Sequence, residues 1–213
     1  IADFLDERCG ELNSIIKDIE AQVEQLKQYK KSLITETVTK GLNRSIKMRD
    51  SGVESIGDIP THWDIKQIKY ISNLITKGAT PEDVSVICDE THLIRFLKAE
   101  NIQNGLLLQE PEFFITKADN VALQRASLRN KDILFVIAGA TIGKVAIMRE
   151  ELCPSNLNQA VCLIRMNINQ CAEYYTYVLQ SNIISVAINL LTVQAAQPNL
   201  SMGSIANIKL PVP

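Results

Sequence analysis

The sequence holds few of the side chains that bind metals or build disulfide frameworks. Its 213 residues include only two histidines and five cysteines, and no two cysteines form a C-x-x-C pair. Because the cysteine count is also odd, neither a zinc site nor a set of disulfides is indicated. We therefore expect no metal, and we interpret each cysteine as a small buried hydrophobic residue.

Long apolar runs are also missing. No stretch approaches the roughly 18 uncharged apolar residues of a membrane helix. The first residues are acidic and amphipathic, unlike a secretory signal segment. These absences predict an intracellular, cytoplasmic protein that does not cross a membrane.

The motifs of common enzyme classes are absent as well. The segment GATIGK at 139–144 resembles a phosphate-binding loop, but that loop needs glycine where Ala138 stands and serine or threonine where Val145 stands. A tight turn between two strands is the better interpretation. No G-x-G-x-x-G or G-x-S-x-G motif occurs, and two histidines with scattered acids indicate no catalytic triad. We predict that this chain is not an enzyme.

Positive charge is not in excess. Lysine and arginine total 22 against 24 acids, which gives a formal net charge of −2. A nucleic-acid-binding domain is usually basic, so overall charge does not favour that class.

The first forty residues carry a heptad repeat. Leucine or isoleucine recurs every seven residues, and the companion positions are apolar until Lys30. This 3–4 spacing predicts a coiled-coil helix over residues 1–41. We expect its dimerisation face to consist of Leu5, Leu12, Ile16, Ile19, Val23, Leu26 and Leu33.

Charge along this helix predicts how it pairs. Residues 1–24 hold seven acids and two bases, whereas residues 25–40 hold four bases and one acid. A parallel copy would place acid beside acid, whereas an antiparallel copy places acid beside base. We therefore predict antiparallel pairing with a second helix of the same kind. Forty residues at about 1.5 Å each span roughly 60 Å, enough to hold two domains at a fixed separation.

The remainder predicts an α+β fold. Residues 42–62 are expected to form a polar linker, and residues 63–213 a mixed α/β domain. Short apolar runs at 93–97, 133–137, 145–148, 161–164 and 208–212 are typical of strands. Residues 174–191 are expected to be helical, with a break near 181–182.

Polar residues gather where loops are expected, and these are our candidate DNA contacts. Amide side chains can read adenine in the major groove, and lysine can meet phosphate. The alternative for each residue is an ordinary hydrogen bond within a turn. The candidates are Lys77, Gly78, Thr80, Lys98, Asn101, Gln103, Asn104, Thr141, Lys144, Asn158, Gln159, Gln194 and Gln197.

Several segments resemble the specificity subunit of Type I restriction–modification systems. The front helix, with its end VTKGL at 38–42, resembles that family's spacer helix, and DSGVESIGDIPTHW at 50–63 resembles the beginning of a target recognition domain. Further similar segments are KDILF at 131–135, GATIGK at 139–144, SNLNQA at 155–160, QPNLS at 197–201 and IKLPVP at 208–213. Their order and spacing cover nearly the whole chain, while residues 75–130 match little.

The resemblance implies a function. A full subunit of this family has two recognition domains and two antiparallel helices, and each domain reads one half of a bipartite double-stranded DNA site. Methyltransferase subunits that carry S-adenosylmethionine dock on it, and a restriction motor subunit can join. This chain holds one helix and one domain, which makes it a fragment or a half-subunit that works as a homodimer. The resemblance implies no cofactor in this chain.

A second interpretation stays open. The coiled coil also suits a protein-interaction adaptor that never touches DNA. Co-purification with a methyltransferase, together with sequence-dependent retention of DNA, would distinguish the two.

Overall fold

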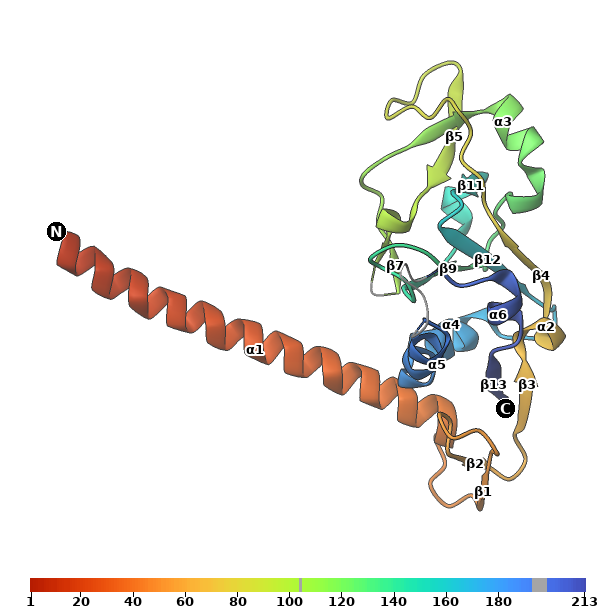
Figure 1. The fold of residues 1–213 in the computed structure, drawn as a ribbon, viewed down its shortest axis with the longest axis horizontal. Helices are drawn as coiled ribbons and strands as arrows, with labels where there is room; N and C mark the ends of the chain where they lie inside the picture. Colours follow the sequence, from red (N-terminus) through yellow and green to blue (C-terminus); the bar gives the residue numbers. More distant parts are fainter. Residues whose placement is uncertain (104, 193–198) are drawn as a thin grey trace.

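The computed structural model describes residues 1–103, 105–192 and 199–213. Figure 1 shows one long helix, α1 (Ala2–Lys40), which projects from a lobe of short strands and helices. The N-terminus lies at the far end of this helix, and the C-terminus lies within the lobe. The expected α+β fold, a long N-terminal helix followed by a mixed domain, is confirmed.

Helix α1 exposes its heptad face. Residues 1–30 are exposed throughout, so the described part of the lobe leaves this stretch open. The helix ends at Gly41, whose φ of 72° favours glycine and whose N–H bonds to the Thr37 carbonyl. The residues of the predicted dimerisation face, Leu5, Leu12, Ile16, Ile19, Val23, Leu26 and Leu33, are between 43% and 66% exposed. The apolar ridge therefore does not fold back onto its own lobe.

The last turns of α1 dock on the lobe through a different face. Val38 is buried in the main core. Thr35 Oγ1 accepts a hydrogen bond of 2.9 Å from the N–H of Asn182, which begins helix α5 (Asn182–Thr192). Since each residue turns a helix by about 100°, Thr35 and Val38 lie on the side opposite to Leu33. Docking on the lobe therefore leaves the heptad face free.

Tyr174 ties this end of α1 to the end of the chain. Its phenol oxygen lies 3.1 Å from the carbonyl oxygen of Val38 and 3.2 Å from that of Pro211. Burial raises the pKa of Tyr174 above its ordinary value, which keeps the phenol protonated and able to donate. Tyr174 also packs edge-on against Trp63.

The segment 42–62 differs from the expected linker. It contains an antiparallel hairpin of β1 (Met48–Asp50) and β2 (Asp58–Pro60). Ile56 and Ile59 of this segment are 7% and 0% exposed and belong to the main core. Its polar composition suggested a linker, but these two isoleucines anchor it to the lobe.

The lobe is built on a four-stranded antiparallel sheet. Its order is β10 (Val145–Ile147), β9 (Ile133–Val136), β12 (Val161–Met166) and β4 (Ser72–Lys77). The residues of β9 alternate between two cores, with Phe135 in one and Leu134 in the other. Both faces of the sheet are covered, which is why β9 reads as a continuous apolar run.

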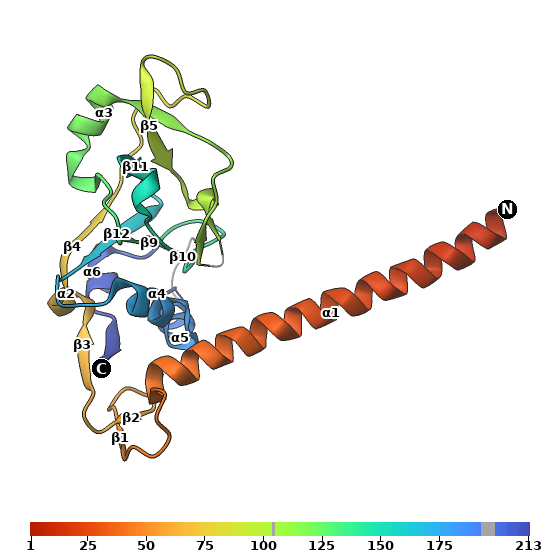
Figure 2. The same cartoon turned by 180° about the vertical axis from the view of Figure 1, so that it is seen from behind.

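Smaller elements surround this sheet. The predicted strands are confirmed, and so is the break in the long helix, which separates α4 (Ala172–Gln180) from α5. Figures 1 and 2 show α4 and α5 beside the C-terminal end of α1.

The other sheets are β11 (Ser155–Leu157) with β5 (His92–Leu97) and β8 (Phe114–Thr116), β13 (Lys209–Val212) with β3 (Asp64–Gln67), and β6 (Ile102–Gln103) with β7 (Leu106–Leu107). The remaining α-helices are α2 (Ile68–Ile71), α3 (Lys117–Ala122), α4 (Ala172–Gln180) and α6 (Met202–Ala206), and three 3-10 turns cover Ala99–Asn101, Gln124–Ala126 and Glu150–Leu152.

The cysteines differ in how far they are buried. The prediction that every cysteine is buried is wrong, because Cys9, Cys88 and Cys171 are exposed and Cys153 is intermediate. Cys162 in β12 is buried, and burial raises its pKa to about 12. Within the described part of the chain, no helix is both long and apolar enough to cross a bilayer.

Candidate functional site

Loops gather at one end of the four-stranded sheet. The register pairs Lys77 with Cys162, Val161 with Val136, and Val145 with Phe135. The end of β4, the end of β9 and the starts of β10 and β12 therefore meet at the same end. We call the residues that leave there, 77–81, 137–144 and 158–160, the loop edge.

Gly78 and Thr80 hold two parts of the loop edge together. A Cβ atom on Gly78 would lie 1.8 Å from the carbonyl oxygen of Leu157, so only glycine permits this approach. Gly78, one of the candidate DNA contacts, thus makes its close backbone approach within the protein. Thr80 Oγ1 donates a hydrogen bond to Oε1 of Gln159. Lys77 and Gln159 are exposed beside them.

Asn158 shapes the turn before β12. Its backbone N–H bonds to the Leu97 carbonyl at 3.0 Å, and its Oδ1 accepts from the N–H of Ala160 at 3.2 Å. The amide oxygen is therefore already engaged in the turn. The contact with Leu97 brings the next candidate, Lys98, to the loop edge.

Asn101 does not reach the surface, which corrects our expectation of a DNA contact there. It is 0% exposed, accepts from the N–H of Lys98 at 2.9 Å and donates to the Pro111 carbonyl at 2.8 Å. Its amide satisfies buried backbone groups, which is a structural role. Lys98 itself lies over the Phe113 ring, with Nζ 3.4 Å from the centroid.

The remaining candidates divide between exposed and undescribed residues. Gln103 is exposed on β6. Asn104, Gln194 and Gln197 lie outside the described residues. The segment after them returns to the loop edge, because Asn199 bridges to Ala138.

The segment 139–144 is a tight turn between β9 and β10, as predicted. The Gly143 N–H bonds back to the Val136 carbonyl at 2.9 Å, which closes the turn. Thr141 and Lys144 are half-buried on this turn. Lys144 therefore stands at the β10 side of the loop edge.

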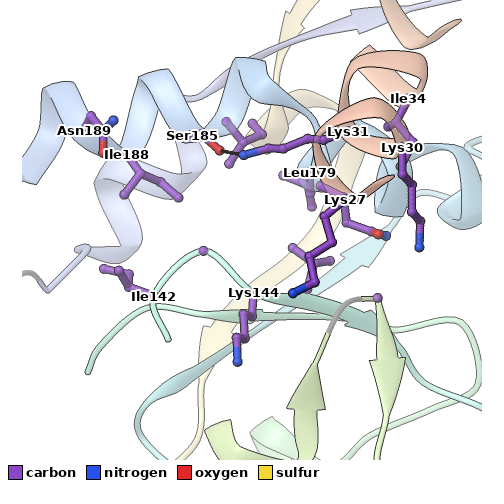
Figure 3. A pocket seen from close by; sticks show the side chains of 15 residues that line it. Lys27, Lys30, Lys31, Ile34, Ile142, Lys144, Leu179, Ser185, Ile188 and Asn189 are labelled. Atoms are coloured by element: carbon purple, nitrogen blue, oxygen red, sulfur yellow. Dashed lines mark hydrogen bonds between the residues drawn. The ribbon is translucent and has the colours of Figure 1, made fainter. Parts of the chain in front are cut away.

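Beside Lys144 lies a basic cleft that sequence reasoning did not find. Its volume is about 520 Å³, and its walls come from α1, α4, α5 and the turn 142–144. Figure 3 shows Lys27 of α1 pointing across the opening toward Lys144, while Lys31 points to Ser185. We call it the lysine cleft; its cationic residues are Lys27, Lys30, Lys31 and Lys144.

A signal for the lysine cleft was present in the sequence. Lys30 occupies a heptad position that was apolar in each earlier repeat, and Lys27 and Lys31 flank it. A polar residue at such a position weakens helix pairing, which can mark another role. The opposite wall of the cleft, however, comes from α4, α5 and the turn 142–144, which lie more than a hundred residues later in the sequence. A sequence pattern alone could therefore not identify the cleft.

The described residues of the site offer hydrogen bonding and positive charge. Among the described residues, no group of histidine, cysteine and acidic side chains could hold a metal ion. The lining of the lysine cleft, as far as the structure describes it, contains no acid. The arrangement suits recognition of a polar, anionic surface.

Comparison with known proteins adds a family match. The model of the Type I restriction modification DNA specificity domain matches residues 60–213. The chain is also 23% identical over 208 residues to the Type I restriction enzyme MjaVIII specificity subunit of Methanocaldococcus jannaschii. That alignment covers 96% of this chain and 47% of that protein.

Solved structures share the fold. The HsdS subunit from Thermoanaerobacter tengcongensis superposes with a TM-score of 0.56 and 11% identity, over 95% of this chain and 43% of that one. A chain from structural work on complex assembly and conformational transition of the type I R-M system gives a TM-score of 0.57 and 12% identity. That superposition covers 93% of this chain and 46% of the other chain. The chain thus spans about half the length of the relatives it matches.

Proposed function

We propose a function from one premise, that this chain belongs to the family of Type I restriction modification DNA specificity domains. We infer that it is a DNA sequence-recognition subunit, or part of one, which reads one half of a bipartite double-stranded site. The gathering of predicted contact residues at the loop edge carries this proposal. Residues separated by 79 positions in the sequence meet there, as Thr80 and Gln159 do.

The loop edge suits base reading in a groove. Gln159 and Thr80 of the loop edge, and Gln103 on β6 outside it, are exposed and polar, and such side chains can bond to base edges. Lys77 and Lys144 stand beside them and supply phosphate contacts, which fix the position of the duplex. Asn158 and Gly78 act indirectly, because they hold the loops in place.

The exposed heptad face supports helix pairing. A ridge of seven large apolar residues is costly to leave in water, and burial of each side chain contributes about 1.5–3 kcal/mol. We propose that it pairs antiparallel with a second helix of the same kind, in a homodimer of this chain. The helix pair then sets the distance between two half-sites.

The chain itself is non-catalytic in this proposal. Methyltransferase subunits, which bring S-adenosylmethionine, dock on it and modify adenine, and a restriction motor subunit joins the complex. Specificity is thereby separated from chemistry, which agrees with a loop edge that is polar but has no acid–base pair.

Mapping methylation in cells tests this function directly. We expect co-expression with the cognate methyltransferase subunits to place methyl groups at adenines within a symmetric two-part motif. Gln159→Ala and Gln103→Ala should each relax the motif at single positions, because a base contact is worth about 1–3 kcal/mol of discrimination. Asn169→Ala serves as the matched control, since it removes an exposed amide beyond the opposite end of β12.

The adaptor interpretation is favoured by one observation, the size of the exposed apolar face. Under it, the chain would co-purify with a partner while methylation stayed independent of the loop edge. An unchanged motif in the Gln159→Ala and Gln103→Ala variants, together with no sequence-dependent retention of DNA, would therefore replace our proposal with the adaptor.

A further inference from the structure

We propose that the lysine cleft binds the phosphate backbone of DNA without reading its bases. This inference rests on the proposed function and extends it from the loop edge to the junction with α1. The cleft is formed by two parts of the molecule, since Lys27, Lys30 and Lys31 come from α1 and Lys144 comes from the lobe. Lys144 belongs to both sites, so the loop edge and the lysine cleft form one continuous surface.

The four ammonium groups differ in how they are engaged. Lys31 Nζ donates to Ser185 Oγ at 2.7 Å, a bond that joins α1 to α5. Lys27 Nζ lies 3.8 Å from a carboxylate oxygen of Glu24, a long and solvated ion pair. Within the described part of the chain, Lys30 and Lys144 have neither an ion pair nor a hydrogen bond from their side chains. Figure 3 shows Lys27 and Lys30 reaching away from the Lys31–Ser185 bond.

This arrangement collects like charges around a shared space. Lysines that face one another across a cleft repel, and no acid among the described lining residues offsets that repulsion. An anion in the space would reverse the sign of the interaction. Phosphate groups of a duplex supply closely spaced negative charge, about one per 1.7 Å of helix axis.

The cleft is poorly equipped to read bases. Its other lining residues are mainly apolar, such as Ile142 and Ile188. The amide of Gln180 already donates to the Thr176 carbonyl at 3.1 Å. Lysine acts on phosphate as a flexible point charge and carries no sequence information there. Contacts in the cleft should therefore be the same for all DNA sequences.

The position of the cleft indicates which part of the DNA it meets. Its lining joins Lys27, Lys30 and Lys31 of α1 to Lys144 of the loop edge, so it lies where α1 leaves the lobe. A duplex seated on the loop edge and continuing along α1 would pass over it. The segment bound there lies between the two half-sites, where the sequence is not read.

The test measures DNA affinity against salt with the full chain. The probe is a 40-base-pair duplex of mixed sequence, titrated at several salt concentrations from about 50 to 200 mM. The variant Lys27→Gln, Lys30→Gln, Lys144→Gln keeps Lys31, because its bond to Ser185 supports the fold. The control Lys17→Gln, Lys66→Gln, Lys209→Gln removes the same charge elsewhere. Circular dichroism and the thermal midpoint verify that both variants fold.

The plot of log K against log salt has a negative slope. We expect this slope to become shallower in the cleft variant by about 2.7, or 0.9 for each lost phosphate contact. The control should keep the wild-type slope. Lys30→Gln alone should make it shallower by about 0.9, and Lys30→Arg should restore it, because Lys30 belongs to the cleft and not to the loop edge.

Two results would overturn the inference. One is a cleft variant with the wild-type slope, and the other is a wild-type chain that fails to bind the duplex even at 50 mM salt. Either result would leave the methylation map unaffected. If that map instead showed no dependence on the loop edge while the slope became shallower as expected, the proposed function would fail and the phosphate site would stand.

Discussion

At the scale of single residues, Gly78 shows how a side chain that is absent shapes the candidate site. The missing Cβ lets the end of β4 pass against the Leu157 carbonyl, and this contact places Thr80 beside Gln159. A larger residue would have to push two backbone segments apart. The polar surface of the loop edge thus depends on the buried packing of Gly78 against the Leu157 carbonyl.

We expect Gly78→Ala to lower the free energy of unfolding by at least about 2 kcal/mol, because the added methyl would overlap backbone that cannot rotate away. Urea denaturation followed by fluorescence of Trp63 measures this. Gly10→Ala is the matched control. No atom lies within 4 Å of its added Cβ, and it should stabilise α1 by about 0.5–1 kcal/mol. Equal stability of the Gly78→Ala and wild-type proteins would contradict this account.

His92 provides a pH-dependent contact at the start of β5. Its Nε2 lies 2.9 Å from Asp83 and its Nδ1 lies 3.2 Å from Asp89. The hydrogen bond to Asp83 is the largest cause that raises the pKa of His92 above about 6.5, and Asp89 adds to it. Because the folded-state pKa is raised, this stabilisation is complete below the unfolded-state value and is lost as pH rises through the folded-state pKa.

We predict that Asp83→Asn lowers the pKa of His92, as followed by NMR titration of its imidazole. Glu82→Gln removes the same charge one residue away and should leave that pKa nearly unchanged. Equal shifts in both variants would mean that general charge, rather than the hydrogen bond to Asp83, is responsible.

At the scale of elements, α1 has two faces with different tasks. One face, at Thr35 and Val38, joins the lobe, and the opposite face carries the heptad. An antiparallel pair that fills every core layer places Ala2 opposite Leu33 and Cys9 opposite Leu26. The same register sets the acidic first half of one helix beside the basic second half of the other, which agrees with the charge pattern.

We expect Leu26→Cys to form a covalent dimer with Cys9 under mild oxidation, because facing core positions fit disulfide geometry. The background should replace Cys88, Cys153 and Cys171 by serine, and non-reducing electrophoresis gives the readout. The same background with Leu26 intact is the control, and it should stay uncrosslinked. A covalent dimer in that control would report Cys9 facing Cys9, which is the parallel arrangement, and would reject our model of pairing.

The sequence identified most elements because their signals are local. The heptad predicted α1, and short apolar runs predicted β5, β9, β10, β12 and β13. The hairpin at 42–62 was missed because the few residues that anchor it, Val53, Ile56, Ile59 and Pro60, are scattered in a polar segment. Asn101 was wrongly predicted to contact DNA. In the sequence, an asparagine that bonds to buried backbone groups cannot be distinguished from an exposed loop asparagine.

The candidate site was predictable only in part for a related reason. The loop candidates were found from composition, but their meeting at one end of the sheet depends on strand register. The lysine cleft needs α1 to dock at a fixed angle on α4 and α5, which no pattern in a single segment specifies.

At the scale of the whole molecule, net charge conceals its distribution. The formal value of −2 averages an acidic outer half of α1 with a basic cleft at its base. The charge that disfavoured DNA binding thus lies mostly on the part expected to meet another helix. Local fields, not the total, decide what each surface attracts.

The attachment of α1 to the lobe by Thr35 and Tyr174 has a geometric consequence. Because this joint is rigid, a longer helix would change the direction from which each lobe faces a bound duplex. It would also change the distance between the two lobes. One added heptad advances the lobe by about 10 Å with almost no net turn. Three base pairs of B-DNA cover that length but rotate by roughly 100°. Tolerated gap lengths should therefore be discrete, with three heptads, about 31 Å, coming close to a full DNA turn of about 34–36 Å.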